Sequence, residues 1–475
     1  MVACTLVDVK RNGGYNYAYF GDAICQYLKK ERQMVKLSKF NYIINDKNEL
    51  RLYNSLHGTD SLLIVNENNK ERVLDYLSDP KESKLDIAII KKLLVNGYIV
   101  PEEEDEDISV RLRANDVINN NCLTLILMPT EDCNFRCEYC YEDHKKGKMS
   151  DTVQKSVVRF VAKNISKYNQ LRVCWFGGEP LCALDVIETL SYSFKQICKV
   201  AKKRYSASMT TNGYNLSLTV LKKLLDINVY DYQITIDGLK SIHDKYRHLV
   251  GGGGTFDRIV GNIKEMQKLR KNNYRVVIRT NFTKESEMEL SDYLSFCEEL
   301  FGTDKRFSLD VHLVGNWGGD SVEKINNHLL NNSSYDILMS EIVRIHPHIR
   351  FDSLLNDLEA YQFKCYAALR NSIVIGSDGC LYKCTEDFEM PTNRLGNLLD
   401  DGSMDIDYNK FAKWVDWTYK VECGECGQCS YMGCCLGSPC PKVKIRNEHG
   451  NFCPRNKKSI ENVVRLLDRD LFETI

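Results

Sequence analysis

The chain has 475 residues, 43% of them hydrophobic and 27% charged, so we expect two or three globular domains in place of one compact core. A formal net charge of −1 argues against a large nucleic-acid interface or a strongly charged membrane-binding face, and no apolar run is long enough to cross a bilayer. Twenty cysteines without a signal peptide predict metal or redox chemistry in a reducing cytoplasm, since dense cysteine indicates disulfides chiefly in small secreted domains.

Residues 1–108 are predicted to form a small domain followed by a linker. Three short strands and two helices are expected, at residues 40–45, 49–54, 61–65, 70–77 and 84–96. This α+β order resembles the winged-helix peptide-recognition domains that precede the catalytic domain of many peptide-modifying enzymes. The resemblance implies a module that binds the leader of a precursor peptide; a capping extension of the catalytic domain is the alternative. The acidic run 102–107 is predicted to be a solvated linker without a function of its own.

Residues 109–320 are predicted to alternate strands and helices. The expected strands are 123–128, 172–176, 206–210, 232–236, 275–280 and 307–314, with helices at 152–164, 183–202, 218–225, 256–271 and 287–300. Repeated βα units give an α/β fold with a parallel sheet, closed or partly closed into a barrel. In parallel barrels, ligands collect at the carboxyl ends of the strands.

Three cysteines follow the first of these strands, in the run Cys133-Asn-Phe-Arg-Cys137-Glu-Tyr-Cys140. Thiolates are the usual ligands of iron–sulfur clusters, and three of them leave one iron of a four-iron cluster open to another ligand. Zinc prefers four closed ligands in structural sites. The spacing therefore favours an iron–sulfur cluster over the two alternatives, a zinc knuckle or three unrelated thiols.

A glycine turn, Gly177-Gly178-Glu179, comes directly after the second strand, where glycine lets the backbone approach a ligand closely. Together with the cysteine run it resembles the radical SAM enzymes. The resemblance implies a partial (β/α)6 TIM-like barrel and a [4Fe–4S] cluster whose open iron binds S-adenosylmethionine (SAM). In that family reductive cleavage of SAM gives a 5′-deoxyadenosyl radical, and the glutamate of the turn, here Glu179, holds the methionine amine.

Polar residues follow the fourth strand and resemble a segment shared by the radical SAM enzymes that carry a SPASM domain. The resemblance implies that Thr235, Asp237 and Arg247 contact the ribose and carboxylate of SAM, and that Tyr139 packs near the adenine. Polar groups that only fix loop geometry, and an aromatic residue of the core, are the alternatives. The sequence assigns no catalytic acid or base.

Residues 321–475 are predicted to form a cysteine-rich domain that metal binding stabilises. The Gly379-x4-Cys384 and Cys426-x2-Cys429-x5-Cys435 elements resemble a SPASM domain, which implies two auxiliary [4Fe–4S] clusters and three clusters in all. By that resemblance the outer cluster is held by Cys426, Cys429, Cys435 and Cys453, and the inner one by Cys365, Cys384 and Cys440. The inner cluster lacks a fourth cysteine, so either Cys380 supplies it or one iron is open. Cys423 and Cys434 compete with their neighbours as ligands, and disulfides or zinc are the alternative to clusters.

These resemblances imply an enzyme that crosslinks a ribosomally made precursor peptide by oxidation, forming cysteine thioether bonds. An open inner iron would lower the pKa of a substrate thiol and position its sulfur. The implied partners are the precursor peptide with its leader and a flavodoxin-like or ferredoxin-like electron donor, with no nucleic acid and no membrane. An anaerobic sulfatase maturase that makes formylglycine is an alternative, although Thr385 stands where those enzymes carry Asp. Carbon–carbon crosslinking, another peptide oxidation and a non-catalytic iron–sulfur carrier are the others.

Overall fold

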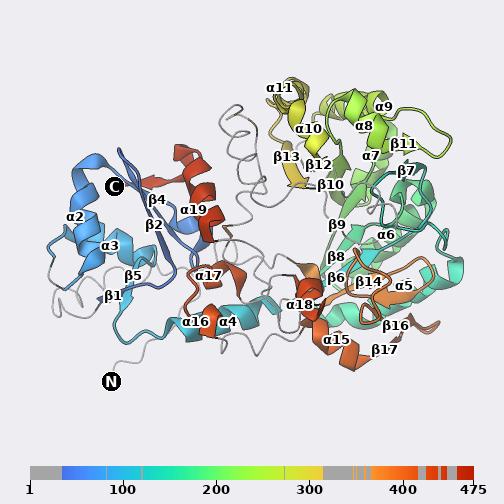
Figure 1. Ribbon diagram of the computed structural model, residues 1–475. Coiled ribbons are helices and arrows are strands. Elements are labelled where there is room, and N and C mark those ends of the chain that lie inside the picture. The colour runs from blue at the N-terminus through green and yellow to red at the C-terminus, as the bar shows by residue number, and fades with distance from the viewer. Residues whose placement is uncertain are drawn as a thin grey trace. The chain divides into compact units, whose positions relative to one another are not determined.

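The computed structural model forms two units (Figure 1), which consist of residues 1–118, 354–365 and 417–475 (unit 1) and of residues 119–353 and 366–416 (unit 2). Within these units the structure describes residues 35–81, 83–118, 121–271, 273–313, 346, 349, 358–359, 365–415, 424–436, 440–446 and 457–475. The described residues of the predicted cysteine-rich domain are therefore shared between the units: those up to 415 fold with the βα repeats, and those from 424 fold with the amino-terminal segment.

Unit 2 contains a ten-stranded mixed sheet whose order is β13-β12-β10-β9-β8-β6-β14-β15-β16-β17. The six strands predicted from the sequence are parallel neighbours: β6 (Cys122–Leu127), β8 (Gln170–Trp175), β9 (Arg204–Thr211), β10 (Val229–Thr235), β12 (Arg275–Phe282) and β13 (Phe307–Leu313). β14 (Ser372–Ile375) adds a seventh parallel strand beside β6. β15 (Cys380–Tyr382), β16 (Arg394–Leu398) and β17 (Met404–Ile406) continue the sheet antiparallel. The predicted α/β class and the six strands are confirmed, and the extension from β14 to β17 was not foreseen.

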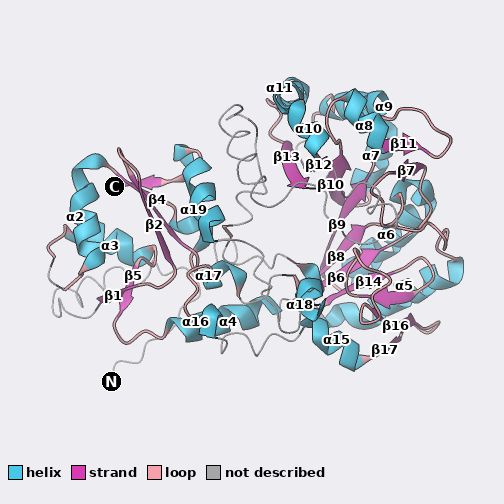
Figure 2. Ribbon diagram, in the orientation of Figure 1, coloured by secondary structure: helices cyan, strands magenta, loops and turns pink. Residues whose placement is uncertain are grey.

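Helices follow the parallel strands in chain order, as predicted. They include α5 (Asp151–Asn164), α6 (Leu184–Val200), α7 (Leu218–Asp226), α9 (Phe256–Gln267) and α11 (Leu290–Phe301). Figure 2 shows α6, α7 and α9 on one side of the row of strands. Ser150 and Ser217 precede α5 and α7, and each side chain accepts a hydrogen bond from a backbone N–H of the first turn, which fixes where the helix begins. The helices bury an apolar stripe against the sheet, so the polar residues at the strand ends are left to form a site.

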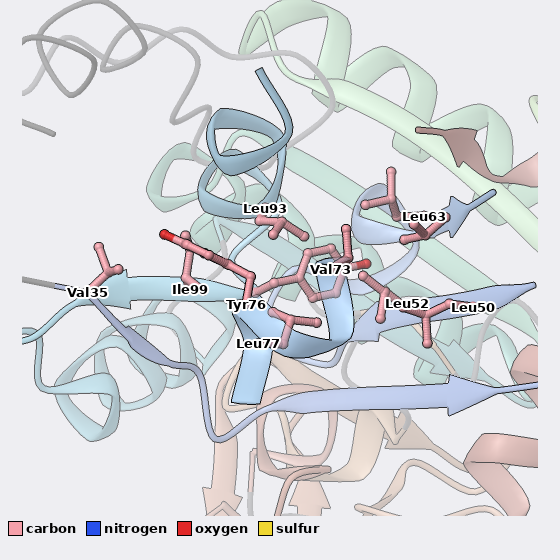
Figure 3. Packing of buried hydrophobic residues seen from close by; sticks show 11 residues of the cluster. Val35, Leu50, Leu52, Leu63, Val73, Tyr76, Leu77, Leu93 and Ile99 are labelled. Carbon is pink, nitrogen blue, oxygen red and sulfur yellow. The ribbon is translucent and has the colours of Figure 1, made fainter. Parts of the chain in front are cut away.

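Unit 1 contains a four-stranded sheet in the order β18-β4-β3-β2. β2 (Asn41–Asn45), β3 (Leu50–Asn54) and β4 (Leu63–Val65) are antiparallel neighbours and match the three predicted strands. Helices α2 (Glu67–Ser78) and α3 (Ile87–Val95) follow, and β1 (Val35–Leu37) pairs with β5 (Ile99–Pro101). One apolar core joins these elements (Figure 3), formed by Val35, Leu50, Leu52, Leu63, Val65, Val73, Tyr76, Leu77, Leu93, Tyr98 and Ile99.

The last residues of the chain complete the sheet of unit 1. β18 (Glu473–Thr474) pairs parallel with β4, and α19 (Lys457–Leu466) contacts β2 and β3. The buried Arg51 donates from Nη1 to the carbonyl oxygens of Val464, Arg465 and Leu467, at 3.0, 3.1 and 2.9 Å. These carbonyls have no partner within the helix, so Arg51 caps the carboxyl end of α19. Sequence reasoning did not connect these distant segments.

The acidic run 102–107 is not only a solvated linker, and that prediction is wrong for its last residues. Helix α4 (Glu106–Ile118) begins within it. The side chain of Glu106 is buried and accepts hydrogen bonds from the Ser38 hydroxyl, at 2.5 Å, and from the Lys39 backbone N–H, at 3.1 Å. Asp107 forms an ion pair with the Lys39 ammonium at 2.6 Å. A buried carboxylate keeps its charge only where donors of this kind replace water.

We expect Glu106→Ala to destabilise unit 1, because two buried donors lose their acceptor. The expected loss in the free energy of unfolding is about 1–3 kcal/mol, and the measurement is the urea midpoint followed by circular dichroism. Glu103, in the same acidic run, is exposed. Glu103→Ala is the matched control and should change the stability by less than about 0.5 kcal/mol. Equal shifts for the two variants would contradict the role given to Glu106.

No helix among the described residues is both long enough and apolar enough to span a membrane.

Candidate active site

A cavity of about 500 Å³ opens at the carboxyl ends of the parallel strands of unit 2. Its lining includes Cys174 near the end of β8, Thr210 on β9, Gln233 and Thr235 on β10, and Arg279 on β12. Because parallel strands present their carboxyl ends on one edge of the sheet, residues distant in sequence meet here. The cavity is where the sequence predicted a ligand site.

The three cysteines of the predicted cluster all line this cavity. Cys137 ends the short strand β7 (Phe135–Cys137), which pairs with β11 (Arg247–Leu249) so that Cys137 lies opposite Arg247. The Cys133 sulfur accepts the Phe135 backbone N–H at 3.3 Å, and the Cys140 backbone N–H donates to the Cys137 carbonyl at 3.1 Å. The backbone of this loop therefore presents all three thiols to one space.

The chemistry of these thiols fits a cluster better than a single metal ion. Among the described residues, no three His, Cys, Asp or Glu side chains converge as one metal ion would require. In a four-iron cluster each thiolate binds its own iron, so thiols spread around a cavity are the suitable arrangement. Burial raises the pKa of Cys133 and of Cys140 to about 12, so both would be protonated at neutral pH unless a metal displaced the proton.

The glycine turn lies directly against the loop that leads into the first cysteine. A Cβ atom on Gly177 would overlap the Thr130 carbonyl oxygen, and one on Gly178 would overlap the carbonyl oxygens of Glu131 and Asp132. Gly177 also has a φ of +114°, which L side chains rarely adopt. Both glycines line the cavity. The turn therefore needs glycine at both positions to approach the cysteine loop.

Glu179 lies beneath the turn and is not among the residues that line the cavity. Its side chain is fully buried. Oε1 accepts from the Leu181 N–H at 3.0 Å and from the Thr211 hydroxyl at 2.7 Å, and Oε2 accepts from the Asn212 N–H at 2.7 Å. These three donors join the ends of β8 and β9. The geometry thus gives Glu179 a support role, and its predicted contact with a ligand amine stays a prediction.

Tyr139, Asp237 and Arg247, three of the predicted contacts, form one buried hydrogen-bonded group. The Tyr139 hydroxyl donates to Asp237 Oδ2 and accepts from Arg247 Nη1 at 2.7 Å. Asp237 Oδ1 accepts the backbone N–H of Asn281 at 2.9 Å. Tyr139 and Arg247 line the cavity, and Asp237 stands behind them. Arg247 Nε has no hydrogen-bond partner although it is buried, so one guanidinium donor is left for a ligand.

His243 holds the Asp237 loop in place. His243 Nδ1 accepts the Asp237 backbone N–H at 3.2 Å. The Thr255 hydroxyl donates to the Arg247 carbonyl at 2.6 Å, so at 3.1 Å it can only accept from His243 Nε2. The ring is therefore neutral with its proton on Nε2. Burial, and next the Arg247 charge, lower the pKa of His243 to about 3.

We expect this histidine to make unit 2 less stable as the pH falls below about 6.5. The unfolded chain then binds a proton on His243 that the folded chain excludes, so its contribution is complete above pH 6.5 and declines by about 1.4 kcal/mol per pH unit below it. The measurement is the urea midpoint at intervals from pH 7 to pH 5. His243→Asn keeps an acceptor near Nδ1 and cannot titrate, so its slope should be smaller; an unchanged slope would contradict this assignment.

Several cavity residues escaped the sequence analysis. The half-buried Glu142 lines the cavity, its Oε2 has no hydrogen-bond partner, and desolvation raises its pKa to about 8. The His144 ring lies 3.6 Å from the Cys140 sulfur through Nε2. Tyr366 and Thr385 also line the cavity, and their hydroxyls are 2.7 Å apart. The position of Glu142 two residues after Cys140 was a signal, whereas nothing in the sequence placed Tyr366 near the barrel.

The auxiliary cysteines are distributed over both units. Cys380 and Cys384 belong to unit 2 and are buried; the Cys380 thiol lies 3.5 Å from Asn397 Oδ1, and Cys384 receives the Glu386 backbone N–H at 3.4 Å. The others described belong to unit 1, namely Cys365, Cys426, Cys429, Cys434, Cys435 and Cys440. Cys423 and Cys453 lie outside the described residues. The predicted inner and outer ligand sets stay predictions.

Comparisons with known proteins agree with this geometry. Residues 127–297, which include the cysteine run and the glycine turn, match the radical SAM superfamily. The radical SAM cyclopropyl synthase TigE of Paramaledivibacter caminithermalis is 23% identical over 92% of this chain and 95% of its own length. The cysteine-type anaerobic sulfatase-maturating enzyme of Clostridium novyi is 30% identical over 31% of this chain and 41% of its own.

One solved structure, native anSMEcpe with bound AdoMet, has the same fold over most of its length. It has a TM-score of 0.57 and 19% identity, covering 72% of this chain and 96% of that one.

Proposed function

We propose that this protein, an enzyme with a radical SAM domain at residues 127–297, crosslinks a ribosomally made peptide by oxidation and forms cysteine thioether bonds. The observation that carries the proposal is the shared cavity. Three thiols, a glycine turn without room for side chains and a buried arginine with a free donor meet at the carboxyl ends of the parallel strands. Cys133, Cys137 and Cys140 would hold a [4Fe–4S] cluster, and the remaining space would hold SAM.

When bound, the reduced cluster and SAM together supply a 5′-deoxyadenosyl radical that removes a hydrogen atom from the substrate. The residues of the chain bind and orient. The backbone of Gly177 and Gly178 approaches the methionine part of SAM, with Glu179 holding that turn rigid from below. Arg247 directs its unpaired Nε–H at an anionic group such as the SAM carboxylate, and Thr235 offers a hydroxyl to the ribose. Tyr139 and Asp237 orient the guanidinium.

The remaining parts of the chain would serve the peptide and the second electron. The winged-helix-like fold of residues 35–101 would bind the leader, which supplies affinity away from the reacting residue. The cysteine-rich segments would form a SPASM domain with two auxiliary clusters, in addition to the SAM cluster. A flavodoxin-like or ferredoxin-like protein of the cytoplasm would supply the electrons. Support for a peptide substrate comes from the related fold of anSMEcpe, whose structure has also been solved with a bound peptide.

Carbon–carbon bond formation in a peptide is the second candidate, and one observation favours it. The cyclopropyl synthase TigE matches nearly the whole chain, including both regions outside the radical SAM domain. Thioether and cyclopropane formation each remove two hydrogens from the peptide, so the two proposals share the radical step and differ in the bond that follows.

Formylglycine formation is less well supported. The resemblance to sulfatase maturases predicts a carboxylate directly after the cysteine at position 384, but Thr385 stands there. Its side chain lines the cavity, and its hydroxyl lies 2.7 Å from the Tyr366 hydroxyl. A neutral pair of hydroxyls at this place cannot accept a proton at neutral pH as a carboxylate does.

The test is anaerobic co-expression of the enzyme with short cysteine-rich peptides encoded beside its gene, followed by mass spectrometry. Loss of two hydrogens per modification together with resistance of one cysteine to alkylation is the result expected for a thioether. The same mass loss with every thiol still reactive would establish the carbon–carbon candidate instead. Reduced protein that does not convert SAM to 5′-deoxyadenosine would overturn both.

A further inference from the structure

The second of two adjacent cysteines, Cys434-Cys435, is a predicted cluster ligand, and the first competed with it for that role. Helix α17 (Met432–Cys435) carries both, within the described segment 424–436, which we call the ligand segment because it also holds Cys426 and Cys429. Neighbouring residues of a helix point about 100° apart. Cys434 is 3% exposed, whereas Cys435 is only half-buried.

The surroundings of Cys434 are those of a protonated thiol. Its sulfur lies 3.2 Å from the Ser55 carbonyl oxygen and 3.4 Å from the Leu358 carbonyl oxygen. The Tyr53 hydroxyl, at 2.8 Å, donates to the Leu358 carbonyl at 2.9 Å, so toward Cys434 it is left with lone pairs. All three neighbours are therefore acceptors, and an iron-bound thiolate, which has no proton to donate, would be repelled by each of them.

The backbone beside Cys434 is in close contact with the amino-terminal module. A Cβ on Gly433 would overlap the Ser55 and Leu56 backbone, so this helix can approach so closely only because position 433 is glycine. The Ser55 hydroxyl donates to the Ser430 carbonyl at 2.5 Å, and Lys39 Nζ donates to the Gly427 carbonyl at 3.3 Å. These contacts hold the ligand segment at three separate points along its length.

Apolar packing joins the same two parts. Met432 and Leu436, on either side of the two cysteines, share one buried cluster with Phe40, Leu56 and Val110 of the module. Cys426 and Cys429 pack at the edge of this cluster and are half-buried. The side of the ligand segment that carries Cys434 is thus covered by the module, while the predicted ligands lie at the border of the contact.

We infer that Cys434 is not an iron ligand but a positioning residue, which seats the ligand segment on the amino-terminal module through Tyr53. The module then forms one wall of the outer auxiliary cluster and is more than a separate leader-binding domain. The presence of that cluster rests on the proposed function, whereas the seating of Cys434 does not.

The first test is alkylation of the native full-length protein with iodoacetamide, before and after iron removal with a chelator, read for each cysteine by mass spectrometry. Cys426, Cys429 and Cys435 should become reactive when iron is removed. Cys434 should stay protected in both states, because the protein itself buries it. Release of Cys434 together with its neighbours would overturn the inference.

The second test compares Cys434→Ser, Cys434→Ala, Tyr53→Phe and Cys435→Ser in the same full-length chain. Cys435→Ser should lose about four irons per chain. Cys434→Ser should keep its iron and the electron paramagnetic resonance signal of the auxiliary clusters, since a hydroxyl donates as the thiol does. Cys434→Ala should keep its iron but shift that signal, as should Tyr53→Phe. Equal iron loss in Cys434→Ser and Cys435→Ser would overturn the inference.

The two proposals fail separately. Wild-type protein that holds iron for the SAM cluster only would overturn the auxiliary clusters of the proposed function. The protection of Cys434 against alkylation, and its release in Tyr53→Phe, would still decide whether Cys434 seats the segment.

Discussion

Cys137→Ala should abolish SAM cleavage, with a fall of more than about 100-fold in the rate of 5′-deoxyadenosine formation. Cys137 ends β7, where its pairing with β11 places it opposite Arg247, and all three thiols of the run line one cavity. With only two thiolates the cluster loses a second protein ligand, so both its retention and its binding of SAM should fail. The measurement is 5′-deoxyadenosine by chromatography after dithionite reduction, with iron content determined in parallel.

Cys182→Ser is the matched control for this variant. Cys182 is exposed, lies close in sequence to the glycine turn and is absent from the cavity lining. It should retain wild-type iron content and wild-type SAM cleavage. If Cys137→Ala kept both, the cysteine run would not hold the cluster, and the assignment of the cavity would fall with it.

Gly178→Ala should reduce SAM cleavage by roughly 5- to 150-fold, since forcing a methyl group into a packed site costs about 1–3 kcal/mol. The new Cβ would overlap the carbonyl oxygens of Glu131 and Asp132, directly before the first cysteine of the run. The loop would have to move away from the turn, and the thiols would move with it. The measurement is again 5′-deoxyadenosine formation, together with the visible absorption of the cluster.

Gly261→Ala is the control for the added methyl group. Gly261 lies in α9, and a Cβ there would meet nothing within 4 Å. Alanine in an exposed helix interior is more stable than glycine by about 0.5–1 kcal/mol, so this variant should melt slightly higher and cleave SAM normally. A Gly178→Ala enzyme as active as Gly261→Ala would show that the turn tolerates a side chain.

The sequence predicted those parts of the fold that depend on local pattern. The six parallel strands and their helices were found from alternating apolar periodicity, with most ends within a few residues, and the glycine turn was placed correctly at the end of β8. What periodicity could not show was pairing between distant segments. β14 beside β6, and β18 beside β4, each consist of a few residues whose partners lie more than 200 positions away.

The candidate site shows the same division. Cys133, Cys137 and Cys140 could be predicted because a ligand spacing is a local property. The support of Glu179 by Thr211 and Asn212 depends on two neighbouring strand ends, and the contact of Tyr366 with Thr385 depends on the extended sheet. For Cys434 the sequence offered only competition with its neighbours, since the carbonyls that decide its role come from distant segments.

The pairing of β18 with β4 also has a consequence for the newly made chain on the ribosome. Residues 473–474 are synthesised about 400 positions after Val65, so at roughly 5–20 residues per second they emerge some 20–80 seconds later. During that interval the edge of β4 has no β18 to pair with, and Arg51 waits for the helix end that it will cap. The amino-terminal module is thus among the first parts to be translated and among the last to be finished.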